Sequence, residues 1–238
     1  MKLDAQLFLD HIRKASVGGV INELVFGNRL SFALTDETKS VVSICSAGLV
    51  EEETNEIGIF DSGLFSRSIQ YAKDIIFAKD QAIEMNLVDN RLVFKNGDNE
   101  FRFLLSAPKA IQTKVNNPDD VLEKVGAGPA VTIGIDSSII DQCLKAIQLI
   151  APDKCTFLVE SGKVKLSVGD EVKHIAIVNL GVAKSRGKFK LVVKPDFLSK
   201  VLSVLPPDKE IVLSLRDGMP LVFTIPGYVV LLASMEIE

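Results

Sequence analysis

The side chains with the richest chemistry in this sequence are few and widely spaced. The three cysteines, Cys45, Cys143 and Cys155, form no CxxC pair, and only two histidines, His11 and His174, could join them as ligands. Zinc sites need closely spaced Cys and His ligands. We therefore predict no metal site, and we expect the cysteines to be buried, reduced thiols of a cytosolic protein.

A catalytic centre is equally hard to assemble from these residues. A hydrolase needs a nucleophile beside a base, and neither histidine lies in a recognisable motif. The run VGAGP at 125–129 lacks the Lys-Ser/Thr of a phosphate-binding loop and the third glycine of a dinucleotide-binding loop. The acidic run Glu51-Glu52-Glu53 lies in a polar stretch and is predicted to be a solvated loop. We predict that the chain is not an enzyme and needs no cofactor.

Composition limits the remaining classes of protein. The chain has 238 residues, 47% of them hydrophobic and 24% charged, which suits two globular domains of about 120 residues. No apolar run reaches the roughly 18–20 residues that span a bilayer, and the acidic N-terminal segment does not resemble a signal peptide. We expect a cytoplasmic protein. A net charge of −4 argues against broad coating of nucleic acid but permits a local basic stripe.

A strand-to-helix junction occurs four times along the chain. Each copy has an apolar pair opening a helical pattern, and the pairs begin 57, 75 and 58 residues apart. Two near-equal intervals flank a longer one, which indicates two similar domains of two similar units each. We predict domains at 1–106 and 130–238, joined by a connector at 107–129 that is a long loop. The apolar pairs are Leu7-Phe8, Leu64-Phe65, Ile139-Ile140 and Phe197-Leu198.

Each junction also carries a helix start signal. Asp4, Asp61 and Asp136 stand three residues before their apolar pairs and are predicted N-caps. In the fourth unit Pro195 takes the first helical turn. Counting the first apolar residue as zero, positions 0, 1, 4, 5 and 8 are expected to face a sheet.

Short strand-like runs follow every predicted helix, so each unit reads as β-α-β-β-β. They include DIIFAK at 74–79, and turn signals such as Asn-Gly and Asp-Gly separate neighbouring runs as in hairpins. We predict an α+β fold in which helices cover one face of antiparallel sheets.

The opposite face of each predicted helix, at positions 3 and 6, carries one basic residue. These are Arg13, Arg67, Lys145 and Lys200. Any exposed helix face can carry Lys and Arg, so the pattern alone leaves a solvated surface open as an interpretation. The alternative is a surface that meets a duplex backbone, because such contacts position a protein without reading sequence. The loop AKSRGKFK at 183–190 adds further basic residues, and it too suits either interpretation.

The end of the chain carries the most specific resemblance. Pro220-Leu221-Val222 begins one predicted strand, and Leu232-Ala233 closes the next before an acidic tail. In this order, and with the repeat spacing, the chain resembles two-domain DNA sliding clamps: proliferating cell nuclear antigen, its archaeal relatives and tailed-phage polymerase clamps. The resemblance spans nearly the full length and is weaker in the first half.

The resemblance implies a function and a set of sites. Such clamps form homotrimeric rings that encircle duplex DNA and tether a DNA polymerase and other replication proteins after a clamp loader places them. The DNA-facing residues would be Arg13, Lys14, Arg67, Lys73, Lys145, Lys200, Lys184 and Arg186. Partner peptides would enter a pocket formed by Ile111, Val115, Pro220, Leu231 and Ala233. Leu231 stands where cellular clamps carry an aromatic residue.

Three further expectations complete this interpretation. Subunits would join through edge strands at about 74–84 and 171–181, which leaves no sheet edge exposed. The short tail and divergent first half favour a viral or phage source, and hence the cytoplasm of a bacterial host. Two alternatives stay open: a monomeric processivity factor of the same fold that binds DNA by charge, and a structural repeat protein of virions.

Overall fold

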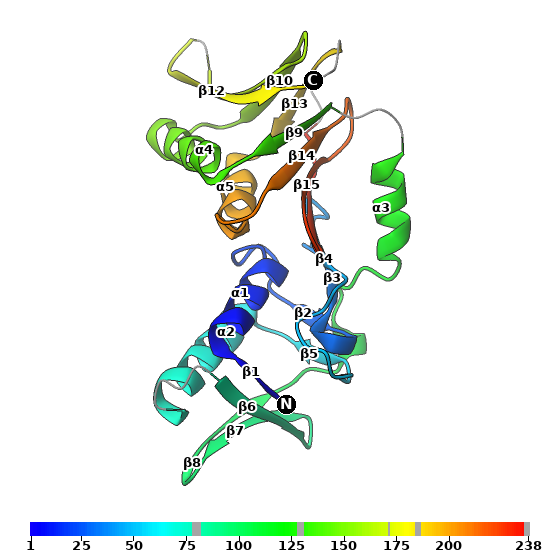
Figure 1. Cartoon of the computed structure of the whole chain (residues 1–238), viewed down its shortest axis with the longest axis vertical. Helices are drawn as coiled ribbons and strands as arrows, with labels where there is room; N and C mark the ends of the chain where they lie inside the picture. The colour runs from blue at the N-terminus through cyan, green and yellow to red at the C-terminus, as the bar shows by residue number, and fades with distance from the viewer. Residues whose placement is uncertain (78–81, 128–130, 171, 184–186, 236–238) are drawn as a thin grey trace. The chain divides into compact units, whose positions relative to one another are not determined.

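The computed structural model describes residues 1–77, 82–127, 131–170, 172–183 and 187–235. The chain divides into two compact units (Figure 1). The N-terminal unit comprises Met1–Glu37 and Ser43–Asn116, and the C-terminal unit comprises Thr38–Val42 and Asn117–Glu238. The predicted connector at 107–129 is therefore divided between the two units at residues 116 and 117.

The first half of the chain contains two β-α-β-β-β repeats, as predicted. The first repeat comprises β1 (Lys2–Asp4), α1 (Ala5–Ala15), β2 (Leu24–Phe26), a short 3-10 turn η1 (Asn28–Leu30), β3 (Phe32–Thr35) and β4 (Val41–Cys45). The second comprises β5 (Ile57–Ile59), α2 (Ser62–Tyr71), the π-helical turn η2 (Ala72–Ile76), β6 (Ala82–Val88), β7 (Arg91–Asn96) and β8 (Asn99–Leu104).

The C-terminal unit repeats this order after two connecting helices. The turn η3 (Pro108–Ala110) closes the first half, and α3 (Pro118–Gly126) opens the second. The third repeat comprises β9 (Val131–Ile135), α4 (Ser137–Ile150), β10 (Cys155–Glu160), β11 (Lys163–Gly169) and β12 (Ile175–Val182). The fourth comprises β13 (Lys188–Val193), α5 (Pro195–Val204), β14 (Ile211–Leu215), β15 (Leu221–Ile225) and β16 (Tyr228–Leu232).

The repeats of a unit exchange their first strands. In the N-terminal unit β1 pairs antiparallel with β6, giving the order β1-β6-β7-β8, while β5 pairs with β2. In the C-terminal unit β13 joins β10 in the order β12-β11-β10-β13, and β9 joins β14 in the order β16-β15-β14-β9. Each repeat therefore contributes its first strand to a sheet of its neighbour.

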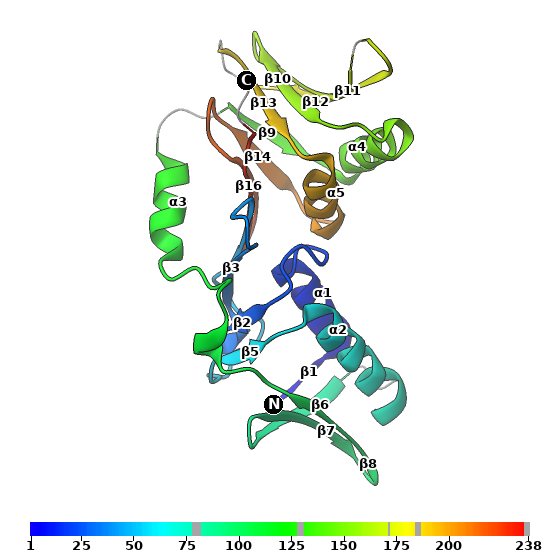
Figure 2. The same cartoon turned by 180° about the vertical axis from the view of Figure 1, so that it is seen from behind.

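The helices pack on these sheets through their buried faces. In the N-terminal unit Phe8 of α1 meets Phe65 of α2 edge to face, with ring centroids 5.8 Å apart, and Phe65 lies 5.0 Å from Phe103 of β8. In the C-terminal unit α4 and α5 lie on one side of the strands and α3 on the other (Figures 1 and 2). Among the described residues, no helix is long and apolar enough to span a membrane.

The three cysteines are free and buried, as predicted. Burial disfavours the thiolate, so it raises the pKa of Cys143 and of Cys155 to about 12. The pKa of Cys45 is also raised by burial. Thiols in this protonated state are poor nucleophiles and poor metal ligands.

Two predictions about the helices are wrong. The run DIIFAK was predicted as a strand, yet its residues 74–76 belong to the π-helical turn that continues α2. Ala72 and Ile76 are buried there, so the run extends the apolar stripe of the helix. The prediction that position 0 faces a sheet is also wrong in the N-terminal unit, because Leu7 and Leu64 are 59% and 47% exposed. The buried stripe uses positions 1, 4, 5 and 8.

The predicted long connector loop also contains regular structure. Pro118 begins α3, with Asp119 and Asp120 in its first turn. A proline and two acids suit the first turn of a helix, where N–H groups are unpaired and the dipole is positive. The described part of α3 buries none of its side chains completely.

Candidate nucleic-acid interface

Three aspartates start the helices as N-caps, as predicted. The N–H of Leu7 donates to Asp4 Oδ1 at 2.9 Å, and Leu64 N–H donates to Asp61 Oδ1 at 2.7 Å. In the C-terminal unit Ile139 N–H donates to Asp136 Oδ1 at 2.9 Å. The fourth helix, α5, has no side-chain cap and starts with Pro195 at its first position. The three caps and Pro195 begin the four helices at equivalent places in their repeats.

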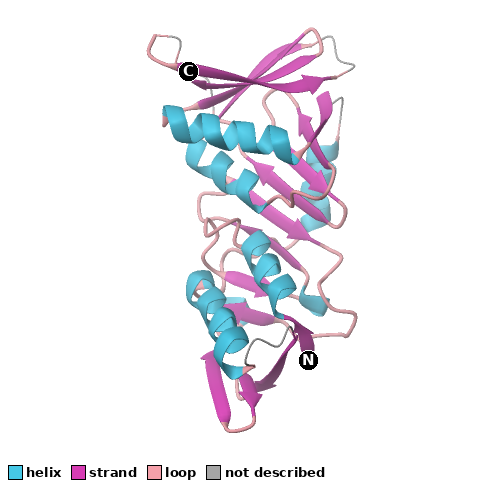
Figure 3. Cartoon of the chain, turned by 60° about the vertical axis from the view of Figure 1, so that its left-hand side comes forward, coloured by secondary structure: helices cyan, strands magenta, loops and turns pink. Residues whose placement is uncertain are grey.

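In the N-terminal unit α1 and α2 lie side by side on the sheets, as do α4 and α5 in the C-terminal unit (Figure 3). Their outward faces are positions 3 and 6, and seven of the eight side chains there are exposed, Ser203 being half-buried. They are Asp10, Arg13, Arg67, Gln70, Gln142, Lys145, Lys200 and Ser203.

In the N-terminal unit four predicted basic residues lie on adjacent helices. Arg13 and Arg67 are exposed, whereas Lys14 and Lys73 are half-buried. Lys73 Nζ donates to Gln6 Oε1 of the neighbouring helix at 3.1 Å. That bond tethers α1 to η2 and holds one cationic group at the seam between the helices.

In the C-terminal unit Lys145 of α4 and Lys200 of α5 are exposed on neighbouring helices. Among the described residues, Arg67, Lys145 and Lys200 form no ion pair. Lysines of this kind keep their hydration and move freely, so they attract phosphates without fixing them. Lys184 and Arg186, which were also predicted to face DNA, lie outside the described residues.

The predicted partner-peptide residues lie in both units. In the C-terminal unit Leu231 of β16 is buried and pairs with Val222, and Pro220 precedes β15. Continuing that register by one pair places Pro220 opposite the half-buried Ala233. Ile111 and Val115 belong to the N-terminal unit.

Of the two segments predicted to be edge strands that join subunits, the one at 74–84 is wrong and the one at 171–181 contains a sheet edge. Residues 82–84 of β6 are covered by β1, whose short strand pairs with them, and residues 74–76 are helical. The open edge opposite β1 is β8. At the second place β12 is the terminal strand of its sheet, as expected. The sequence pattern did not indicate β8 as the open edge, because it did not reveal that β1 covers β6 at the other end of the sheet.

Comparisons with known proteins agree with this architecture. No family model matches the sequence, and no curated protein matches it. Among solved structures, the chain is similar to Archaeoglobus fulgidus PCNA bound to the C-terminal region of FEN-1, with a TM-score of 0.72, 16% identity and coverage of 100% of this chain and 98% of that one. For Thermococcus kodakaraensis PCNA the TM-score is 0.68 at 16% identity, and the similarity covers 99% of both chains.

A bacterial clamp is similar over a shorter span. For the Thermotoga maritima DNA polymerase III beta subunit the TM-score is 0.72 at 12% identity, covering 100% of this chain and 64% of that one. The chain therefore spans about two thirds of the beta subunit. Together with the four repeats, these matches establish that the chain has the DNA sliding clamp fold.

Proposed function

We propose that this chain is a DNA polymerase processivity factor that assembles as a homotrimeric ring around duplex DNA. The observation that carries the proposal is the matched placement of basic side chains on the outward faces of α1, α2, α4 and α5. In a protein of net charge −4, this local cationic surface favours contact with a phosphate backbone. Weak, mobile contacts allow a ring to slide, whereas its closure prevents dissociation.

Subunit joining in this proposal uses the two sheet edges β8 and β12. Leu104, the last residue of β8, is 67% exposed, and on β12 Ile177 and Val182 are 59% and 76% exposed. Long exposed edges with apolar side chains are normally covered. Antiparallel pairing of β8 from one subunit with β12 of the next would cover both edges. A head-to-tail contact of this type forms a ring when its rotation closes.

The proposed partners follow from the same fold. Polymerase and a clamp loader would contact the ring, and a partner peptide would use Pro220, Leu231 and Ala233 with Ile111 or Val115. We propose that the chain carries out no catalysis of its own and acts in the cytoplasm, that of a bacterial host for a phage protein. The FEN-1 complex of the A. fulgidus clamp supports peptide capture by proteins with this fold.

Two measurements test the proposal. Light scattering over a dilution series should give three times the chain mass of 25.9 kDa, or about 78 kDa. Loaded protein should then stay on circular plasmid and leave the same plasmid after linearisation, because a ring slides off free ends. Equal retention on both DNAs would support the alternative, a monomeric factor that binds by charge. A protein retained on neither would contradict both.

A further inference from the structure

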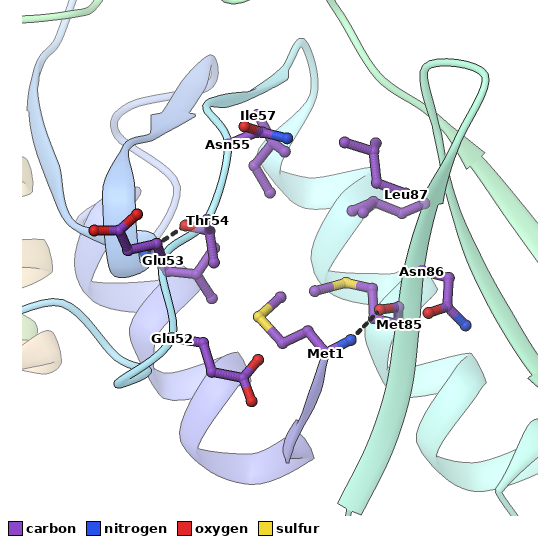
Figure 4. Close-up of a pocket in the computed structure, with 11 residues that line it drawn as sticks. Met1, Glu52, Glu53, Thr54, Asn55, Ile57, Met85, Asn86 and Leu87 are labelled. Atoms are coloured by element: carbon purple, nitrogen blue, oxygen red, sulfur yellow. Dashed lines mark hydrogen bonds between the residues drawn. The ribbon is translucent and has the colours of Figure 1, made fainter.

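A groove opens on the N-terminal unit beside β6 and the start of α1, and we name it the β6 groove. It consists of two adjoining pockets of about 250 and 310 Å³, both lined by Met1 and Glu52. Figure 4 shows the smaller pocket, with β6 on one side and the segment 52–57 on the other. Its apolar lining is Met1, Leu30, Ile57, Met85, Leu87 and Leu92.

One wall of the groove, the segment 49–54, is held in place by backbone and side-chain hydrogen bonds to η1 and to Gly27 before it. The carbonyl of Arg29 accepts from Leu49 N–H at 2.7 Å, and Arg29 Nε donates to the carbonyl of Val50 at 3.0 Å. Thr54 N–H donates to Asn28 Oδ1 at 3.0 Å, and its Oγ1 donates to the Gly27 carbonyl at 3.1 Å. A wall fixed in this way loses little entropy when a ligand binds.

The close approach of this wall to Arg29 explains why residue 48 is a glycine. Gly48 has a φ of +73°, and a Cβ there would lie 2.5 Å from the Arg29 carbonyl oxygen. Only glycine allows both the positive φ and the contact. The shape of the groove is therefore encoded locally.

The other wall offers an unpaired strand edge. Met85 exchanges both backbone bonds with Met1, at 2.8 and 2.9 Å. In an antiparallel ladder, groups two residues apart face the same side, so Leu87 turns its N–H and C=O towards the groove. No described strand pairs with Leu87 on that side. Its side chain is 47% exposed and continues the apolar face of Met85.

The charge around the groove is negative. Glu51, Glu52 and Glu53 are exposed and line the two pockets. Among the described residues, none of these three carboxylates has an ion-pair partner. Lys2 is the basic side chain that lines the larger pocket. Apolar lining, an open strand edge and an acidic rim together select a ligand with apolar and cationic side chains.

We propose that the β6 groove docks an extended peptide segment of a partner protein, in which an apolar residue is flanked by Lys or Arg. The peptide backbone exchanges hydrogen bonds with Leu87, its apolar side chain enters the pocket over Met85 and Leu92, and its cations meet Glu52 and Glu53. This goes beyond the proposed function, because the groove lies within one unit and needs neither a ring nor DNA.

A displayed library of random linear nonapeptides, panned on the full chain, tests the proposal. Counter-selection uses the charge-reversed variant Glu52→Lys/Glu53→Lys, whose two exposed positions tolerate the change. A matched control, Glu37→Lys/Asp98→Lys, alters the net charge equally at exposed positions outside the groove lining. We expect enriched peptides to carry an apolar residue beside Lys or Arg, and to bind the charge-reversed variant at least tenfold more weakly but the control equally well.

The location is tested with one enriched peptide added to isotopically labelled chain. The backbone amide signals of Leu87 and Thr54 should shift in the wild type. In Leu87→Pro, which removes the edge N–H, the signal of Thr54 should stay unchanged. Enriched peptides without cationic residues, or with equal affinity for the charge-reversed variant, would overturn the proposal. So would a Leu87→Asp variant that lowers the self-associated mass in light scattering while peptide affinity is unchanged, since a second copy would then occupy the groove.

Discussion

The guanidinium of Arg216 binds the end of the connector helix α3, donating from Nη2 to the Gly126 carbonyl at 2.9 Å. Nη1 of the same side chain donates to the carbonyls of Val125 and Ala127. Arg216 begins the turn between β14 and β15, so a hairpin of the sheet cradles a helix C-terminus. A cation there satisfies unpaired carbonyls and complements the helix dipole.

We expect Arg216→Met to loosen α3 without unfolding the sheet. Three charge-assisted bonds are lost, and a local cost of roughly 2 kcal/mol is reasonable. Amide hydrogens of 118–126 should then exchange about thirtyfold faster, while those of β14 and β15 stay protected. Arg102→Met, which removes an exposed arginine, serves as the control. Unchanged exchange in α3 would show that Arg216 does not anchor the helix.

A second prediction concerns acid stability. His11 lies buried between Phe26 and Phe32, and its Nε2 donates to the Leu30 carbonyl at 2.6 Å. Burial, offset in part by this bond and aided by nearby Lys14, lowers the pKa of His11 from 6.5 to about 4. Between these values the unfolded state binds more protons, so stability should fall as the pH drops below 6.5 and level off near pH 4.

The full difference between the two pKa values of His11 corresponds to about 3 kcal/mol of unfolding free energy. Urea unfolding at several pH values should show this loss in the wild type and a reduced loss in His11→Gln, which keeps an amide donor for the carbonyl of Leu30. His174→Gln, at an exposed position, is the control and should follow the wild type. If His11→Gln loses stability towards low pH as steeply as the wild type, another group is responsible.

The sequence predicted the helices well and the sheet connections poorly, for physical reasons. Caps such as Asp136 and the apolar stripe are local signals that survive in any fold. The strand β1 has only three residues and pairs with another repeat, so nothing local reveals that it covers β6. For α3 a signal was present, since Pro118 followed by two acids marks a helix start. The wall at 49–54 depends on contacts with Arg29, which no local pattern reveals.

The helix faces that we propose to meet DNA give a third prediction. Lys145→Glu/Lys200→Glu should weaken retention on circular plasmid and lower the slope of log affinity against log salt by roughly 2, about 0.9 for each phosphate contact. The matched control is Lys163→Glu/Lys165→Glu on β11, where the exposed lysines alternate with the buried Val164 and Leu166. Equal effects of both double variants would mean that net charge, and not the helix face, attracts DNA. The solution mass should not change in either variant.

The proposed edge pairing gives the last prediction. Leu104→Asp and Ile177→Asp each place a charge beside an edge that would be covered in the ring. Each variant should therefore dissociate at a higher protein concentration than the wild type. The light-scattering mass would fall from about 78 kDa towards 25.9 kDa. Leu149→Asp, a change at an apolar residue that is 81% exposed on α4, controls for lost surface hydrophobicity.

The two edge variants also distinguish a ring from other assemblies. Because β8 and β12 meet head to tail in the proposed trimer, a mixture of Leu104→Asp with Ile177→Asp retains one intact pair of edges and should form dimers of about 52 kDa, twice the chain mass. Such dimers have one blocked edge at each end and cannot close. A mixture that recovers the trimer mass, or variants that remain trimeric alone, would place the subunit contact elsewhere on the chain.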